Sequence, residues 1–123
     1  MSKYNNKKVY QYSNGSYTVG YKNGTPVMTF DSVKEFNRWC LLKTLEKGGV
    51  ITGLERQTKF ALIPTLRTFD GKPVRGVSYI ADFVYTDKKG RRHVEDVKGV
   101  KTEVYKLKKK MMLYVYHIDV EEV

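Results

Sequence analysis

The sequence predicts an α/β fold in which helices flank a mixed β-sheet and a β-meander precedes them. Three observations predict it. Residues 9–30 alternate aromatic or branched side chains with polar ones, as half-buried strands do. Residues 32–47 and 102–114 carry apolar side chains at helical spacing. Between these helices lie two apolar runs typical of interior strands, residues 77–86 and 92–97.

The size and charge of the chain narrow its class. Its 123 residues are enough for one domain and too few for two. We therefore expect a single domain, residues 1–123, with a β extension over residues 1–30 and a core over residues 31–123. The net charge of +10 favours a polyanionic partner, with nucleic acid ahead of a membrane surface.

The compartment is expected to be the cytoplasm. No apolar run approaches the roughly 20 residues that span a bilayer, and the first eight residues lack the apolar core of a signal peptide. Cys40 is the only cysteine, so no internal disulfide can form, which fits a reducing compartment.

The N-terminal strands are marked by their turns. Asn14-Gly15 and Asn23-Gly24 are strong hairpin-turn pairs. They separate alternating runs over residues 9–12, 16–21 and 27–30, which predicts a small meander in chain order.

The first helix is predicted from its caps and its apolar face. Ser32 and Glu35 have capping-box spacing, and Gly48-Gly49 ends the helix after Lys47. Glu35 also falls within the apolar arc, so it has two open interpretations, a cap partner or an inward-facing ligand. The apolar arc consists of Val33, Phe36, Trp39, Cys40 and Leu42.

The remaining elements follow in order. Residues 50–54 predict a short strand or turn, residues 57–63 a strand, and residues 66–73 a loop or irregular hairpin. The runs over 77–86 and 92–97 predict a hairpin that turns at residues 87–90.

The C-terminal part predicts a helix and a last strand. Thr102 caps a helix that continues to about Tyr114, and residues 116–120 predict a strand. Because a strand that follows a crossover helix usually joins the same sheet in parallel, the predicted core order is helix, three antiparallel strands, helix, strand.

Two carboxylates and a lysine stand inside the hairpin strands, where isolated charges are costly to bury. Side-chain alternation places Asp96 and Lys98 on one face and Glu95 on the other. The hairpin turn is short enough to bring Asp82 beside Asp96, although the sequence does not define the register of the two strands. A bulge would exchange Glu95 for Asp96. The alternative interpretation is a surface hairpin in which these charged residues form ordinary salt bridges. The apolar residues around them in both strands favour a functional site instead.

This set of residues suits phosphodiester hydrolysis. Mg²⁺ held by carboxylates neutralises phosphate charge and lowers the pKa of a bound water. A neighbouring lysine orients that water and stabilises the developing negative charge. We therefore expect Mg²⁺ as cofactor, with Mn²⁺ as a substitute.

The order of these residues resembles the PD-(D/E)xK nuclease superfamily. From about residue 24 to the end, the chain is similar to a narrower group, the small phage-encoded endonucleases regarded as Holliday junction resolvases. The similarity is carried by Phe30–Glu35, Gln57, Tyr79–Phe83, Glu95–Gly99 and the series Thr102, Tyr105 and Lys108. Ala81 stands where the superfamily often has proline.

The resemblance implies a restriction-endonuclease-like fold with the core order αβββαβ. It assigns Glu35, Asp82 and Asp96 as metal-binding acids and Lys98 as the catalytic lysine. The implied activity is metal-dependent hydrolysis of branched DNA by a homodimer that serves DNA recombination in the host cytoplasm. Nicked, flapped or linear duplex DNA is an alternative substrate, and a non-catalytic basic DNA-binding phage protein is an alternative function.

Further residues are candidates for contact with DNA. The density of cations beside the predicted site favours a surface that follows phosphates. Gln57, at a predicted strand start, is an accessory candidate, and Glu95 is another. The predicted nucleic-acid contacts are Arg91, Arg92, Lys101, Lys106, Lys108 and Lys109.

Overall fold

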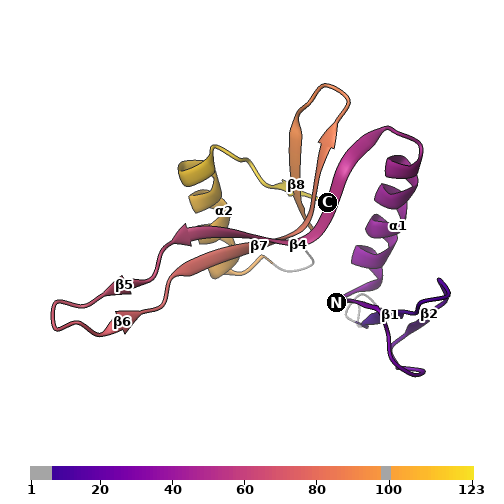
Figure 1. Ribbon diagram of the computed structural model, residues 1–123, viewed down its shortest axis with the longest axis horizontal. Coiled ribbons are helices and arrows are strands. Elements are labelled where there is room, and N and C mark those ends of the chain that lie inside the picture. The colour runs from indigo at the N-terminus through magenta and orange to yellow at the C-terminus, as the bar shows by residue number, and fades with distance from the viewer. Residues whose placement is uncertain (1–6, 98–100) are drawn as a thin grey trace. The chain divides into compact units, whose positions relative to one another are not determined.

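The structure is a computed structural model that describes residues 7–97 and 101–123. The chain divides into two compact units, Met1–Gly48 and Gly49–Val123, whose elements are labelled in Figure 1. Helix α1 (Val33–Lys47) belongs to the first unit with the N-terminal strands. Both units contain helix and strand, so the predicted α/β class is confirmed at that level.

The first unit holds a three-stranded antiparallel sheet in the order β2-β1-β3. The predicted meander order is wrong, because β1 and not β2 is central. The Asn14-Gly15 turn closes the first hairpin, and the chain then returns along the free edge of β1. Val9 and Phe30 face each other there and are fully buried. The three strands are β1 (Val9–Gln11), β2 (Tyr17–Val19) and β3 (Met28–Phe30).

Helix α1 begins and ends as predicted. The Ser32 side chain accepts a hydrogen bond from the Glu35 backbone N–H at 3.1 Å, and Gly48 is the C-cap. The predicted apolar face is wrong at Cys40, which is exposed because it points away from the buried stripe. The buried residues of the helix are Glu35, Phe36, Trp39 and Leu42.

The second unit is built on a four-stranded sheet in the order β4-β7-β8-β9. The first three strands pair antiparallel, and β9 pairs with β8 in parallel. The strands predicted over 50–54 and 57–63 are one continuous strand. The bounds are β4 (Ile51–Ile63), β7 (Val77–Asp87), β8 (Arg92–Asp96) and β9 (Glu121–Glu122).

A small hairpin connects β4 to β7 and continues their direction (Figure 1). It consists of β5 (Leu66–Arg67) and β6 (Pro73–Val74), paired antiparallel. Its turn is closed by a bond of 2.8 Å from the Thr68 N–H to the Lys72 carbonyl. The predicted irregular hairpin is therefore present and ordered by local bonds.

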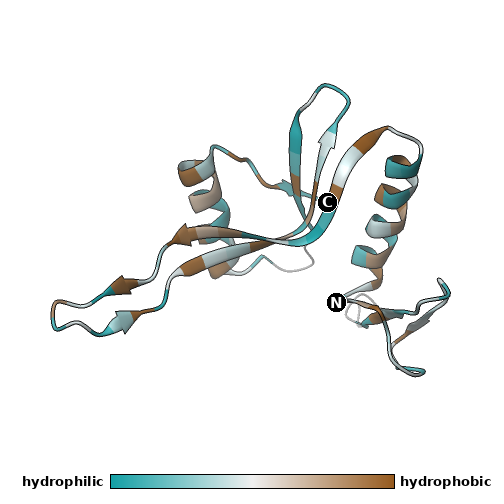
Figure 2. Ribbon diagram, in the orientation of Figure 1, coloured by the Kyte–Doolittle hydropathy of each residue, from teal (hydrophilic) through white to brown (hydrophobic). Residues whose placement is uncertain are grey.

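Helix α2 (Glu103–Tyr116) packs on one face of this sheet. Thr102 caps it through a bond of 3.1 Å from the Tyr105 N–H. Figure 2 shows hydrophobic segments of β4 and β7 beside α2. The strand predicted over 116–120 is wrong, because the helix continues to Tyr116 and ends at His117, whose φ is +58°. The buried cluster is Phe60, Leu62, Tyr79, Ala81, Val84, Val94, Tyr105, Met112 and Val120.

No helix in the described parts of the chain is long and apolar enough to cross a membrane.

Candidate functional site

Strand β7 changes its alternation at Asp82. Tyr79 and Ala81 belong to the buried cluster beside α2, and so does Val84, so the side-chain pattern slips by one residue between Ala81 and Val84. On the neighbouring strand, the register places Gln57 opposite Asp82, and the φ of Gln57 is +55°. A left-handed backbone is costly for a residue with a side chain. The strain therefore coincides with the position of a candidate acid.

The antiparallel register of β7 and β8 pairs Phe83 with Glu95. The next residues toward the end of the ladder, Asp82 on β7 and Asp96 on β8, therefore stand opposite each other. The Asp82 carboxylate accepts a bond of 2.7 Å from the Val97 backbone N–H, at the point where β8 ends. Its other oxygen lies 3.3 Å from the Gln57 amide nitrogen. Asp82 is therefore oriented from both neighbouring strands.

Asp96 and Glu95 lie on opposite faces of the sheet, as alternation predicts. Tyr79 donates a hydrogen bond to Asp96 on the face that carries α2. Tyr85 donates a hydrogen bond to Glu95 on the other face. Both acids are almost completely buried, at 2% and 0% exposure. Since the β7–β8 register is regular from Arg92 to Glu95, no bulge exchanges the two acids.

A pocket of about 270 Å³ opens beside Asp96. Its walls include Tyr79 from β7, together with Thr102, Tyr105 and Lys108 from the start of α2. Burial is the main cause that raises the pKa of both tyrosines above the ordinary value, and the charges of Asp96 and Asp82 add to it. Both hydroxyls therefore stay protonated donors at neutral pH.

Two of the six predicted DNA-contacting cations lie at or just before the start of β8, and four lie on or just before α2. Arg91 and Arg92 lie at the far end of β8 from Asp96, and the Arg92 guanidinium lies 5.1 Å from the Phe60 ring centroid. Lys106 pairs with Glu103 at 3.5 Å. Lys108 alone of the six lines the pocket that Asp96 also lines.

The other two cations hold the last strand in place. Lys101 and Lys109 contact the Glu122 carboxylate at 2.9 and 3.3 Å. Tyr105 donates to the same carboxylate at 2.8 Å. The Lys101 ammonium is the main cause that lowers the pKa of Glu122, to about 2, followed by the Tyr105 bond. These cations therefore join α2 to β9 next to Asp96.

For two predicted site residues, the structure gives no position relative to this cluster. Lys98 lies outside the described residues. Glu35 is buried on α1 in the first unit, so its place beside Asp82 and Asp96 stays a prediction. Within residues 7–97 and 101–123, no group of three or more His, Cys, Asp or Glu side chains is arranged to hold a metal ion.

Sequence reasoning missed the tyrosines of the site. Tyr79 and Tyr105 stand among the residues that carry the resemblance, but the resemblance assigns neither of them a role in the site. A signal was available for Tyr105, because it follows the cap Thr102 at the N3 position of the helix. That signal indicates only the position of Tyr105 in the helix, and nothing in the sequence indicates that the Tyr79 or Tyr105 hydroxyl reaches a carboxylate.

Fold and site define a small basic α/β protein with two opposed carboxylates on adjacent strands, beside the start of a helix. Residues 1–122 match the family described as a protein of unknown function (DUF1064), and the chain belongs to that family. No curated protein and no solved structure matches the sequence.

Proposed function

We propose that the protein is a metal-dependent endodeoxyribonuclease that hydrolyses branched DNA. The observation that carries the proposal is the opposition of Asp82 and Asp96 on adjacent strands, with Asp96 and Lys108 lining one pocket. Two acids side by side repel each other unless a cation or proton compensates them. A cation between them, in a protein of net charge +10, suits a phosphodiester substrate.

The donor set fits a hard divalent cation. Mg²⁺ prefers oxygen ligands and binds through one or two carboxylates together with waters and substrate phosphate. Asp82 and Asp96 supply two such carboxylates, and each is held by a protein donor, Val97 N–H and Tyr79 O–H. Hydrogen bonds of this kind orient metal-binding carboxylates. Mg²⁺ held there would supply charge neutralisation and a water of lowered pKa.

The chain's own residues have separable roles in this proposal. Lys108 binds a phosphate at the mouth of the pocket. Tyr79 holds Asp96 in its orientation. Glu35 completes the acid set, and Lys98 orients the attacking water, as the resemblance to the PD-(D/E)xK superfamily implies. That resemblance also supplies the restriction-endonuclease-like core, the branched substrate and the homodimer, which cuts two strands with two sites.

One observation favours a second function, a non-catalytic DNA-binding protein. Asp82 and Asp96 both accept hydrogen bonds from the protein, so they also serve to tie β7 to β8. A structural role for both acids would leave the basic surface as the functional feature. The two functions differ in whether DNA is cut.

The experiment uses a labelled four-way junction and a matched linear duplex, each with Mg²⁺ or with EDTA. We expect Mg²⁺-dependent cuts in the junction, lost in Asp82→Asn and Lys98→Ala while binding is retained. Equal cutting of the linear duplex would remove the branched substrate and keep the nuclease. Binding without cutting would establish the second function in its place.

A further inference from the structure

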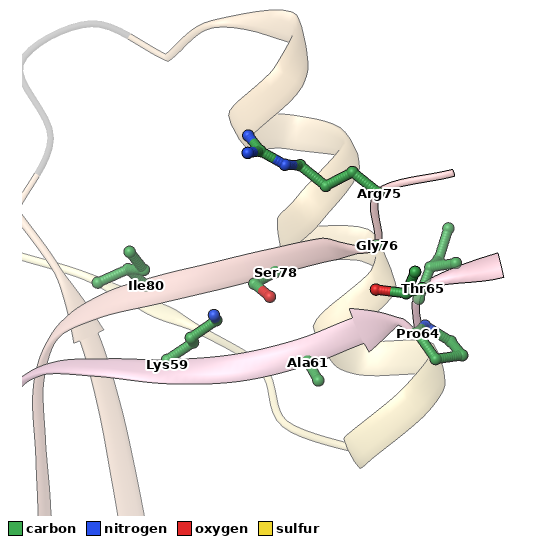
Figure 3. A pocket seen from close by; sticks show the side chains of 9 residues that line it. Lys59, Ala61, Pro64, Thr65, Arg75, Gly76, Ser78 and Ile80 are labelled. Atoms are coloured by element: carbon green, nitrogen blue, oxygen red, sulfur yellow. The ribbon is translucent and has the colours of Figure 1, made fainter. Parts of the chain in front are cut away.

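A second pocket, of about 570 Å³, lies along β4 and β7 near the β5–β6 hairpin (Figure 3). Its lining brings together two cations, Lys59 on β4 and Arg75 just before β7, with the hydroxyl-bearing residues Thr65 and Ser78. Figure 3 shows Lys59 and Ser78 coming from the two neighbouring strands, with Arg75 at the turn. The described residues that line it include no acid.

Neither cation is committed to another role in the described chain. Both side chains are exposed, and neither forms an ion pair with a residue that the structure describes. By contrast, Lys101, Lys106 and Lys109 are paired with glutamates. Two unpaired cations beside hydroxyl donors form a site for an anion with several oxygens, such as a phosphate group.

The pocket has a fixed backbone wall. A Cβ on Gly76 would stand 2.3 Å from the Ile63 carbonyl oxygen and 2.9 Å from the Pro64 carbonyl carbon. Only glycine therefore lets the start of β7 lie against the end of β4. This close approach holds Arg75 on the same pocket as Lys59.

The second pocket adjoins the first. Ser78 and Ile80 line both. Lys59 pairs with Ile80, the residue next to Tyr79, and Arg75 lies four residues before Tyr79, or about 13 Å at the rise of a strand. Phosphates of one DNA strand follow each other about every 3.4 Å along the duplex axis. The two cations therefore lie within roughly four nucleotides of Tyr79 along one strand.

We propose that Lys59 and Arg75 bind backbone phosphates of the DNA strand whose neighbouring phosphodiester lies at Asp82 and Asp96. The inference rests on the proposed function for the identity of the substrate. It adds a binding site on the β4–β7 strands, outside the six cations predicted from the sequence. Its role is to position the strand, and it takes no part in bond cleavage.

The test measures binding of a labelled junction in EDTA, where no cutting occurs, as a function of salt concentration. Removing one phosphate contact lowers the slope of log K against log salt by about 1. We expect Lys59→Ala and Arg75→Ala each to lower it by about 1, and the double variant by about 2. The charge-conserving pair Lys59→Arg with Arg75→Lys should keep the wild-type slope.

The matched control is Lys43→Ala, which removes one charge from a lysine paired with Glu46 in the first unit. A slope in the double variant equal to that of wild type, or a loss no larger than Lys43→Ala gives, overturns the inference. So does the absence of DNA binding by the wild type. Cutting with an unchanged slope refutes this inference alone. Binding through Lys59 and Arg75 without any cutting refutes the nuclease and leaves the pocket.

Discussion

The Tyr79 hydroxyl donates a hydrogen bond to the Asp96 carboxylate, and both residues are buried, Tyr79 at 3% and Asp96 at 2% exposure. A buried acid that loses its donor keeps the full cost of its desolvation. This bond therefore fixes the acid both energetically and in orientation. The same relationship recurs on the other face of the sheet, where Tyr85 donates to Glu95.

The tyrosine pair allows a matched test. We expect Tyr79→Phe and Tyr85→Phe each to lower the free energy of unfolding by about 1–3 kcal/mol, since each leaves a buried carboxylate short of a donor. Only Tyr79→Phe should weaken Mg²⁺ binding, so that the Mg²⁺ concentration needed for half-maximal cleavage rises about 10- to 100-fold. Urea unfolding and a Mg²⁺ titration of cleavage measure the two effects. Equal loss of activity in both variants would show that Tyr79 has no special relation to the site.

Gln57 provides a test of backbone strain. Glycine in a strand ordinarily costs about 0.5–1 kcal/mol relative to alanine. At Gln57, where φ is +55°, the order should reverse, with Gln57→Gly more stable than Gln57→Ala by about 1 kcal/mol. The neighbouring Thr58 is the control, because its φ is not positive and Thr58→Gly should be the less stable of its pair. The midpoints of denaturant unfolding of the four variants measure this. If the alanine variant is the more stable one at both positions, the backbone of Gln57 is not strained.

His93 gives the fold a pH dependence outside the candidate site. Its ring nitrogens lie 2.7 Å from carboxylates of Asp87 and Glu121. The bond to Asp87 is the main cause that raises the pKa of His93 above 6.5, against the effect of burial. A raised folded pKa gives stability that is complete below the unfolded value and is lost as pH rises through the folded value.

We therefore expect wild type to lose up to about 1 kcal/mol relative to His93→Asn as pH rises from 6.5 into the alkaline range. The same His93 bond is the main cause that lowers the pKa of Asp87, so the contribution of Asp87 is lost in acid. Unfolding free energies measured from pH 5 to pH 9 test this. Parallel pH profiles for the two proteins would contradict it.

The elements with strong local signals could be predicted from the sequence. Helix α1 was predicted to its last residue, because Ser32 and Gly48 are local caps. The β7–β8 hairpin and the separation of Asp96 from Glu95 followed from alternation over a short, regular strand. Each of these depends on neighbours within a few residues in the chain.

The rest depends on contacts that distant segments make. The central place of β1 reflects which of its edges β3 occupies, and no turn signal encodes that choice. The change of side-chain alternation in β7 at Asp82 lies opposite Gln57, whose backbone is left-handed. Glutamine is not a residue type that predicts a left-handed backbone. Glu122 meets Lys101 and Lys109 only after α2 has crossed the sheet. The second pocket likewise needs Gly76 packed on the end of β4.

The most direct test of the nuclease compares two adjacent buried acids. Asp96→Asn and Glu95→Gln change neighbouring residues on opposite faces, and circular dichroism of both variants is the check that each still folds. With a labelled four-way junction and Mg²⁺, we expect Asp96→Asn to lose at least about 100-fold in cleavage rate while Glu95→Gln keeps most of it. Cleavage by Asp96→Asn at the wild-type rate, or cutting by wild type that persists in EDTA, would contradict the account.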